Sequence, residues 1–247
     1  MILKQQDKFL LSDLNTLGRE FADNSPEEIL RWVWGSYGCN AVMSSSFQTQ
    51  SVPLLHMISK VCPEMVIVFI DTGLHFPETL AFRDELQERF RLHLKVIRPE
   101  FGPGENDDQM YRDDPDRCCY IRKVRCMYTF LQDNEIGAWV TGIRRGQTPQ
   151  RSNIAELQPR PDGILHIHPL ARWTTAQVTE YINKHDLPVH PLFNKGYISI
   201  GCGPCTKPVA ATDDERQGRW SWTNKTECGL LQPVHEHTES ALNAKTT

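Results

Sequence analysis

The stretch that decides the fold is Met65-Val66-Ile67-Val68-Phe69-Ile70, which runs directly into the polar turn Asp71-Thr72-Gly73. Six apolar residues in a row predict a strand buried on both faces, as in a parallel sheet covered by helices. Pro77-Glu78-Thr79 then opens a helix, because proline is favoured at the first helical position. The unit is therefore a strand, a polar turn and a helix.

The same unit recurs on both sides of this stretch. Upstream, Ala41-Val42-Met43 predicts a strand that leads through Ser44-Ser45-Ser46-Phe47 into a helix containing Leu54, Leu55, Met57 and Ile58. Downstream we expect strands at 94–97, 138–142 and 164–167, and a helix from Thr174 in which Gln177 completes a capping box. This alternation predicts an α/β fold with a doubly wound, mostly parallel sheet.

Three polar segments follow predicted strands: Ser44-Ser45-Ser46, Asp71-Thr72-Gly73 and Arg144-Arg145. Ligands of such sheets bind beyond the carboxyl ends of the strands, so the three segments can converge on one crevice. A hydroxyl-rich turn before a helix offers N–H groups and the positive end of a dipole to a phosphate. The alternatives are that the serines are only caps and turns and that the arginines are a solvated loop. The serine turn is not a Walker A loop, because no Gly-Lys-Ser/Thr follows it.

Two tight cysteine pairs stand far apart in the chain, Cys118-Cys119 and Cys202-Gly203-Pro204-Cys205. Thiolates are soft ligands, and four of them complete a Cys₄ metal or cluster shell. Vicinal cysteines have Cα atoms only about 3.8 Å apart, below the usual disulfide range, but they can bind different metal atoms of one cluster. The pairs favour a [4Fe–4S] cluster, with zinc and a dithiol switch as alternatives. Cys-Gly-Pro-Cys is also the active-site motif of thioredoxin, but here it stands near the chain's end, followed by Pro208.

Composition narrows the class of protein. The 247-residue chain has a net charge of −4 and a pI of 6.1, so no global basic field recruits nucleic acid. No apolar run approaches the ~20 residues of a membrane span, and the start lacks the features of a signal peptide. Eight cysteines without export signals indicate a reducing compartment, so we expect a cytoplasmic protein. A homo-oligomer and a monomer both remain open.

The chain divides into three predicted parts. Residues 1–36 hold N-terminal helices packed on the main domain, with a helix start at Ser25-Pro26-Glu27-Glu28. Residues 37–212 form the nucleotide-binding domain. Residues 213–247 form a mobile C-terminal tail in which Cys228, beside Gly229, is either an incidental thiol, like Cys39, Cys62 and Cys126, or a mobile nucleophile. Its position and flanking residues favour the nucleophile.

Cations accompany both cysteine-bearing regions. The acidic connection 101–116 delivers Cys118-Cys119 to a helix with Arg122, Lys123 and Arg125, whose charges would offset those of a cluster or hold an anionic substrate. The tail carries Arg216 and Arg219, one turn of a helix or extended loop apart.

Many of these motifs, in this order, resemble the assimilatory adenylyl-sulfate (APS) and phosphoadenylyl-sulfate (PAPS) reductases, specifically their iron–sulfur-containing branch. The resemblance runs from about Ala41 to Leu230 and rests on the following motifs: Asp71-Thr72-Gly73 with Phe76-Pro77-Glu78-Thr79, Cys118-Cys119 with Arg122-Lys123, Thr141-Gly142-Ile143-Arg144-Arg145 with Gln147, His190-Pro191-Leu192, Gly196-Tyr197, Ser199-Ile200-Gly201-Cys202, Arg216-x-x-Arg219-Trp220, and Glu227-Cys228-Gly229-Leu230.

The resemblance implies a sheet of the adenine-nucleotide alpha-hydrolase (ATP-pyrophosphatase-like) type and a set of residue roles. A [4Fe–4S] cluster would be bound by Cys118, Cys119, Cys202 and Cys205, with Lys123 near it. Cys228 would be catalytic. Substrate contacts would come from Ser44, Ser45, Ser46, Arg144, Arg216 and Arg219. We add Lys123 to this substrate-binding set, and also Asp71, Thr72, Gly73 and Arg145, because they are expected to converge at the strand ends.

The implied reaction is the reduction of APS to sulfite and AMP in sulfate assimilation and cysteine biosynthesis. The thiolate of Cys228 would attack sulfur and displace AMP, and a second thiol would release sulfite from the S-sulfocysteine. The stretch after Cys228 is too short for a fused thioredoxin-like module, so we expect the electrons from a separate thioredoxin or glutaredoxin.

Several alternatives remain open. PAPS could be the substrate, because the serine turn resembles the cluster-free branch, although both cysteine pairs favour APS. An adenylating tRNA-modifying enzyme would need an RNA-binding surface that the composition does not indicate. A non-enzymatic iron–sulfur regulator would leave the crevice and Cys228 unexplained. Two positions depart from the family pattern: Leu231 replaces a histidine, and Gln48 replaces a glycine or Ser-Gly.

Overall fold

The computed structural model describes residue 21 and residues 24–209 and 215–230. Most of the predicted N-terminal segment before Ser25, the tail residues 213, 214 and 231–247, and therefore Leu231 lie outside these described residues. Helix α2 (Pro26–Tyr37) begins as predicted. The Ser25 hydroxyl accepts from the Glu28 backbone N–H while the Glu28 carboxylate accepts from the Ser25 N–H, a reciprocal cap that satisfies two otherwise unpaired donors.

Six strands form one sheet in the order β3-β2-β1-β4-β6-β5. Each of the five predicted strands is present, and the mostly parallel arrangement is confirmed by four parallel pairings. The short edge strand β5, which pairs antiparallel with β6, was not predicted because Leu-Gln-Pro has no apolar run. The strands are β1 (Ala41–Ser44), β2 (Val66–Ile70), β3 (Leu94–Ile97), β4 (Ala138–Thr141), β5 (Leu157–Pro159) and β6 (Leu165–Ile167).

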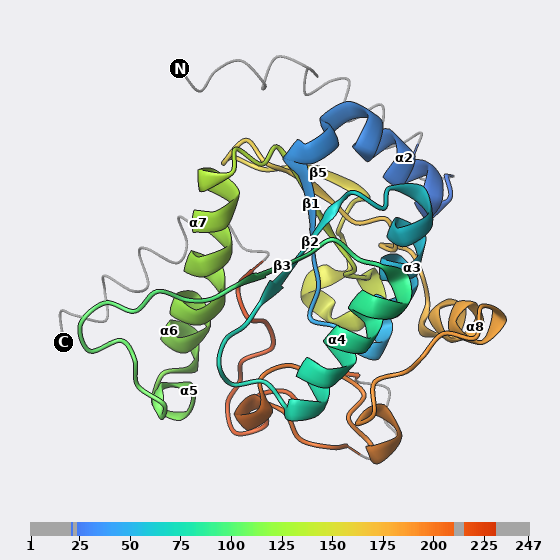
Figure 1. The fold of residues 1–247 in the computed structure, drawn as a ribbon. Coiled ribbons are helices and arrows are strands. Elements are labelled where there is room, and N and C mark those ends of the chain that lie inside the picture. The colour runs from blue at the N-terminus through green and yellow to red at the C-terminus, as the bar shows by residue number, and fades with distance from the viewer. Residues whose placement is uncertain (1–20, 22–23, 210–214, 231–247) are drawn as a thin grey trace.

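Helices cover both faces of the sheet (Figure 1). Along β1, Met43 packs in the core shared with α2, α3 (Val52–Val61), α4 (Pro77–Phe90) and α8 (Thr175–Lys184). Its neighbour Val42 packs in the second core with α7 (Cys126–Asp133). Successive residues of a strand point to opposite faces. Because each face of the sheet is covered by helices, both sets of residues are buried, and the central strands are therefore continuous apolar runs in the sequence.

The helical stretch that carries the first cysteine pair is irregular. Helices α5 (Met110–Asp113) and α6 (Pro115–Cys119) lead into a π-helical turn, η4 (Tyr120–Arg125), and then into α7. A π-helical turn inside a helix often occurs at a functional site, and this one carries Lys123. The 3₁₀ turns are η2 (Gly38–Asn40), η3 (Thr49–Ser51), η5 (Arg145–Gln147), η6 (Pro149–Arg151), η7 (Phe193–Lys195) and η8 (Gly203–Cys205).

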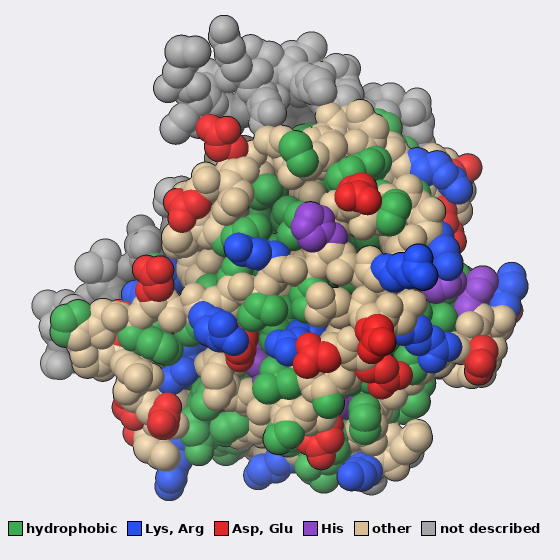
Figure 2. Space-filling model, in the orientation of Figure 1, with side chains coloured by type: hydrophobic (Ala, Val, Ile, Leu, Met, Phe, Trp, Pro, Cys, Tyr) green, Lys and Arg blue, Asp and Glu red, His purple; other side chains and the backbone are tan. Residues whose placement is uncertain are grey.

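The surface carries mixed charge. On the face shown in Figure 2, Lys and Arg side chains lie between Asp and Glu side chains and apolar ones, as expected from a net charge of −4. Within the described part of the chain, none of the helices combines the length and the apolar character that crossing a membrane would require.

Candidate active site

A cavity of about 820 Å³ lies at the carboxyl ends of the central strands, within the size range of small-molecule sites. Ser44 ends β1 directly opposite Thr141, which ends β4, so the parallel register brings both to the same edge. The C-terminal segment 223–230 closes the other side of the cavity. The predicted crevice is therefore present, but a segment without helix or strand supplies part of its wall.

The serine turn lines the cavity with all three predicted residues, Ser44, Ser45 and Ser46. The Trp139 indole donates to the Ser44 hydroxyl at 2.8 Å, and the Phe47 backbone N–H donates to the Ser45 hydroxyl at 3.1 Å. Phe47 has a φ of +53°, in the left-handed region, and its buried ring contacts Phe69 edge-to-face, with 5.6 Å between the ring centroids. Buried packing thus holds this left-handed conformation at Phe47, where the family's pattern has glycine one residue later.

The turn after β2 does not line the cavity. Asp71 accepts hydrogen bonds from the Gly73 N–H at 3.1 Å and from Arg98 Nε at 3.1 Å. The Thr72 hydroxyl lies 3.3 Å from Cys202 Sγ, and the Thr72 carbonyl accepts from Arg122 at 3.0 Å. None of the three residues predicted to contact the substrate therefore lines the cavity, and one of them, Thr72, contacts the cysteine region instead.

The two cysteine pairs come together, as predicted. Cys119, Cys202 and Cys205 pack around Trp220, and each of the four cysteines is only 5% exposed. An antiparallel bridge between His75 and Cys202 fixes the second pair, and the Gly203 N–H donates to the Leu74 carbonyl at 2.6 Å. All eight cysteines of the chain are free thiols.

Burial and neighbouring charges shift the pKa values of these thiols in opposite directions. Burial, together with the neighbouring thiols, raises the pKa of Cys118 and of Cys205 to about 11. At Cys202 burial opposes ionisation, but Lys123 and the Thr72 hydroxyl outweigh it and lower the pKa. Among the described residues, no three His, Cys, Asp or Glu side chains are placed to share a single metal ion. Four soft donors from two segments are the donor set that a Cys₄ iron–sulfur cluster would need.

Lys123 links this thiol region to the cavity, which it lines. Burial opposes its charge, but the nearby Cys202, Cys119 and Cys228 together raise the pKa of its ammonium group. Cys228 also lines the cavity and is half-buried. Burial acts against its thiolate, yet Lys123, a backbone hydrogen bond from Leu230 and Arg216 lower the pKa of this thiol. A cysteine with a lowered pKa beside a cation is the usual form of a reactive thiol.

Glu227, the residue before Cys228, is held by two arginines. Arg151 donates to its carboxylate from Nε at 2.7 Å and from Nη2 at 2.6 Å, a two-pronged geometry that is the strongest form of such pairs. The Thr148 hydroxyl donates at 3.0 Å and Arg216 Nη2 at 3.3 Å. Burial opposes the charge, but these partners outweigh it and lower the pKa of Glu227.

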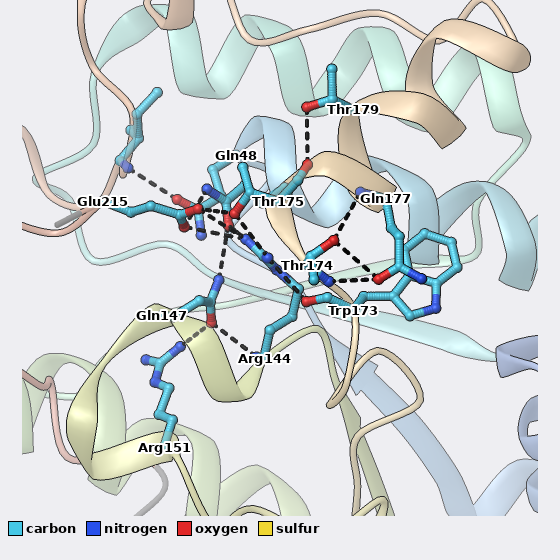
Figure 3. A network of polar contacts seen from close by, with 12 residues as sticks. Gln48, Arg144, Gln147, Arg151, Trp173, Thr174, Thr175, Gln177, Thr179 and Glu215 are labelled. Carbon is cyan, nitrogen blue, oxygen red and sulfur yellow. Dashed lines mark hydrogen bonds and ion pairs between the residues drawn. The ribbon is translucent and has the colours of Figure 1, made fainter. Parts of the chain in front are cut away.

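A second carboxylate, Glu215, lies in the chain that leads to the segment 223–230 and pairs with Arg144. The Arg144 guanidinium is 1% exposed and lies 3.2 Å from the Glu215 carboxylate (Figure 3). Arg144 also donates to Gln50, which accepts from Gln147 at 2.9 Å. Gln147 in turn accepts from Arg151 at 2.5 Å. The two carboxylates are therefore the ends of one polar network.

The predicted arginines are placed differently from one another. Arg216 and Arg219 line the cavity, whereas Arg144 and Arg145 do not. Arg144 is not a solvated loop residue either, because it is buried in the network. Arg145 donates to the Ile154 carbonyl at 2.7 Å and pairs with Glu156 at 3.3 Å. Arg151, Glu215 and Glu227 were missed from sequence. The only available signal was the position of Glu227 beside Cys228.

Comparisons with known proteins agree with this architecture. Residues 40–208 match the family described as the phosphoadenosine phosphosulfate reductase domain. The chain is 41% identical over 225 residues to a phosphoadenosine 5'-phosphosulfate reductase of Gloeobacter violaceus, covering 88% of this chain and 92% of that one. It is 36% identical over 232 residues to an adenosine 5'-phosphosulfate reductase of Halalkalibacterium halodurans, covering 92% and 100%.

A solved structure shows the same fold. The phosphoadenylyl-sulfate reductase of Candida auris, in a phosphate complex, superposes with a TM-score of 0.71 at 26% identity, covering 80% of this chain and 97% of that one. The predicted doubly wound α/β sheet of the adenine-nucleotide alpha-hydrolase type is thereby confirmed. The chain belongs to the phosphoadenosine phosphosulfate reductase domain family.

Proposed function

We propose that this protein reduces adenylyl sulfate to sulfite and AMP, with Cys228 as the nucleophile. The observation that carries the proposal is that Cys228 lines the strand-end cavity together with Lys123, whose charge acts on its thiol, and with the serine turn. The relatives' names support a sulfonucleotide substrate but include reductases of both APS and PAPS.

In the first step the Cys228 thiolate attacks the sulfur atom of the substrate. The bond between sulfur and the oxygen shared with phosphate breaks, and AMP leaves with the electron pair, so that Cys228 carries an S-sulfonate. Arg216, Arg219 and Lys123 line the cavity and would bind the phosphate and sulfate oxygens. Each charge-assisted hydrogen bond contributes roughly 1.5–3 kcal/mol.

In the second step a thiolate of thioredoxin or glutaredoxin attacks the sulfur of Cys228. Sulfite leaves with the bonding pair, and a mixed disulfide forms between the two proteins. The second thiol of the reductant then attacks this disulfide and restores the Cys228 thiol. The two electrons thus come from the reductant's dithiol, which ends as a disulfide.

The four buried cysteines would hold a [4Fe–4S] cluster. When bound, such a group would cross-link the two cysteine segments and set the electrostatic environment of this wall of the cavity. Lys123, which already balances the charge of neighbouring thiols, would lie between that wall and the substrate. The electrons of the proposed reaction pass through Cys228 and the reductant's dithiol.

PAPS is the second candidate substrate, favoured by the relative from Gloeobacter violaceus and by the form of the serine turn. The test is sulfite release with thioredoxin as reductant, comparing kcat/KM for APS and PAPS. We expect APS to be preferred, because both cysteine pairs are present. A hundredfold preference for PAPS would reverse the choice, and sulfite release from neither nucleotide would overturn the reductase function.

A further inference from the structure

We propose that Glu227 is a positioning residue that docks Cys228 in the cavity for the first half-reaction and takes no part in the second. This inference rests on the proposed function. It concerns the step at which the thiol must be held against the substrate's sulfur atom, and it assigns that task to a carboxylate that touches no reacting atom.

The contacts of Glu227 are dense and directional. Its carboxylate accepts four hydrogen bonds, of 2.6 to 3.3 Å, from Thr148, Arg151 and Arg216. Two of them come from the fork of one guanidinium, which fixes orientation as well as distance. Arg151 is itself held from behind by Gln147 at 2.5 Å, so the partner of Glu227 is anchored in the body of the protein.

Cys228 is fixed from its other side as well. Gly229 follows it with a φ of +84°, a conformation that glycine adopts without strain. Leu230 then packs against the core that contains Val42 and Trp139. The thiol therefore lies between an ionic anchor one residue before it and an apolar anchor two residues after it. No helix or strand holds residues 221–230, so these side-chain contacts define where the thiol lies.

The arginines that hold Glu227 also border the cavity, which Arg151 and Arg216 both line. The carboxylate neutralises part of their charge close to the place where an anionic substrate would bind. Removing that negative charge strengthens, or leaves unchanged, the attraction between the cavity and the substrate. Loss of Glu227 is therefore expected to slow adduct formation while substrate affinity stays the same or rises. A general loss of structure would lower both.

The other carboxylate gives an internal contrast. Glu215 pairs with Arg144, deep in the protein and twelve residues upstream of Glu227 in sequence. Glu215 therefore anchors the chain well before the segment 223–230 that carries the Cys228 thiol. Its removal is expected to lower stability and both half-reactions together, whereas the removal of Glu227 acts on the first alone.

The test compares Glu227→Gln, which keeps the shape and removes the charge, with the control Glu88→Gln on an exposed position of α4. In single turnovers with excess APS, the S-sulfonate on the Cys228 peptide is followed by mass. We expect it to form about tenfold more slowly, or slower still, in E227Q, with substrate affinity unchanged or tighter. Sulfite release from pre-sulfonated protein by thioredoxin should stay at the wild-type rate or rise.

A second readout does not depend on the reaction. Cys228 should be alkylated by a bulky neutral maleimide several-fold faster in E227Q than in wild type, with the exposed Cys39 as the reference thiol. Thr148→Val, which removes one of the four hydrogen bonds, should shift both readouts in the same direction by less. The unfolding midpoint of each variant shows whether it is folded.

The outcomes are separable. If E227Q forms the adduct and is alkylated at wild-type rates, the positioning role is wrong while the proposed function stands. If adduct formation, sulfite release and substrate affinity fall together, Glu227 is structural only, and the inference is wrong. If wild type and E88Q themselves form no adduct on Cys228, the proposed function fails and this inference fails with it.

Discussion

The two walls of the cavity are built by different means. The strand-end wall is set by backbone pairing, in which Ser44 lies opposite Thr141 because β1 and β4 are parallel neighbours. The C-terminal wall, residues 223–230, has neither helix nor strand and is held by side chains, above all Glu227 on Arg151. The chain that leads to this wall is held in turn by Glu215 on Arg144. The first wall is therefore a property of the fold, whereas the second depends on a few contacts that single substitutions can remove.

The cysteine region joins the two walls, and its loss should have the largest effect. Protein purified without oxygen should be brown with close to four irons per chain, as a [4Fe–4S] cluster requires. Cys202→Ser should remove the colour and the iron, whereas Cys39→Ser, at an exposed position, should keep both. The measurements are the visible spectrum and the metal content. A colourless wild type with stoichiometric zinc would contradict the assignment.

Removing the deeper carboxylate should destabilise the protein next most strongly. Glu215→Gln leaves the Arg144 guanidinium, 1% exposed, without its counter-charge. We expect a loss of about 2–3 kcal/mol in the free energy of unfolding, below the ~3–5 kcal/mol typical of fully buried pairs, because Glu215 is 15% exposed. Denaturant unfolding measures it, with Glu88→Gln as the matched control. An unchanged free energy would mean that this contact does not anchor the segment.

Gly218 tests the approach of the C-terminal segment to the rest of the chain. A Cβ added at Gly218 would clash with the Lys207 carbonyl oxygen, so the backbone must shift. We expect Gly218→Ala to cost about 1–3 kcal/mol, the usual penalty for overpacking. Gly146→Ala meets nothing within 4 Å and should leave the unfolding midpoint nearly unchanged. Equal midpoints for the two variants would show that the approach is not tight.

Acid should weaken the strand-end wall through buried histidines. Burial lowers the pKa of His166 and of His168 to about 3, and His168 is bonded to the Thr141 hydroxyl at 2.8 Å. Between pH 6.5, their ordinary pKa, and about pH 3, these two histidines bind protons in the unfolded chain but not in the folded protein. Stability should therefore fall as pH drops below 6.5, by up to ~1.4 kcal/mol per pH unit for each histidine. His168→Gln should reduce this slope, whereas His93→Gln, at an exposed position, should not. If wild type and His168→Gln lose stability with falling pH at the same rate, burial of His168 is not a cause of the acid sensitivity.

The contrast between the walls also explains what the sequence could predict. The central strands and the α2 cap were read from apolar runs and capping residues, because these signals are local. The meeting of Cys118-Cys119 with Cys202 and Cys205 was inferred from ligand chemistry. The burial of Arg144 and the pairing of Glu227 with Arg151 could not be read, because they depend on side chains 71 and 76 residues apart. The short strand β5 was missed because its three residues carry no apolar run or periodic pattern that would predict a strand.

The central claim is that Cys228, docked in the cavity, takes the sulfonate. The most direct test is the peptide mass of protein incubated with adenylyl sulfate in the absence of any thiol. The wild type should gain one sulfonate on the peptide that contains Cys228. Cys228→Ser should gain none and release no sulfite, while keeping its cluster and its substrate binding. A sulfonate on Cys205, or near-normal sulfite release by the serine variant, would contradict the claim.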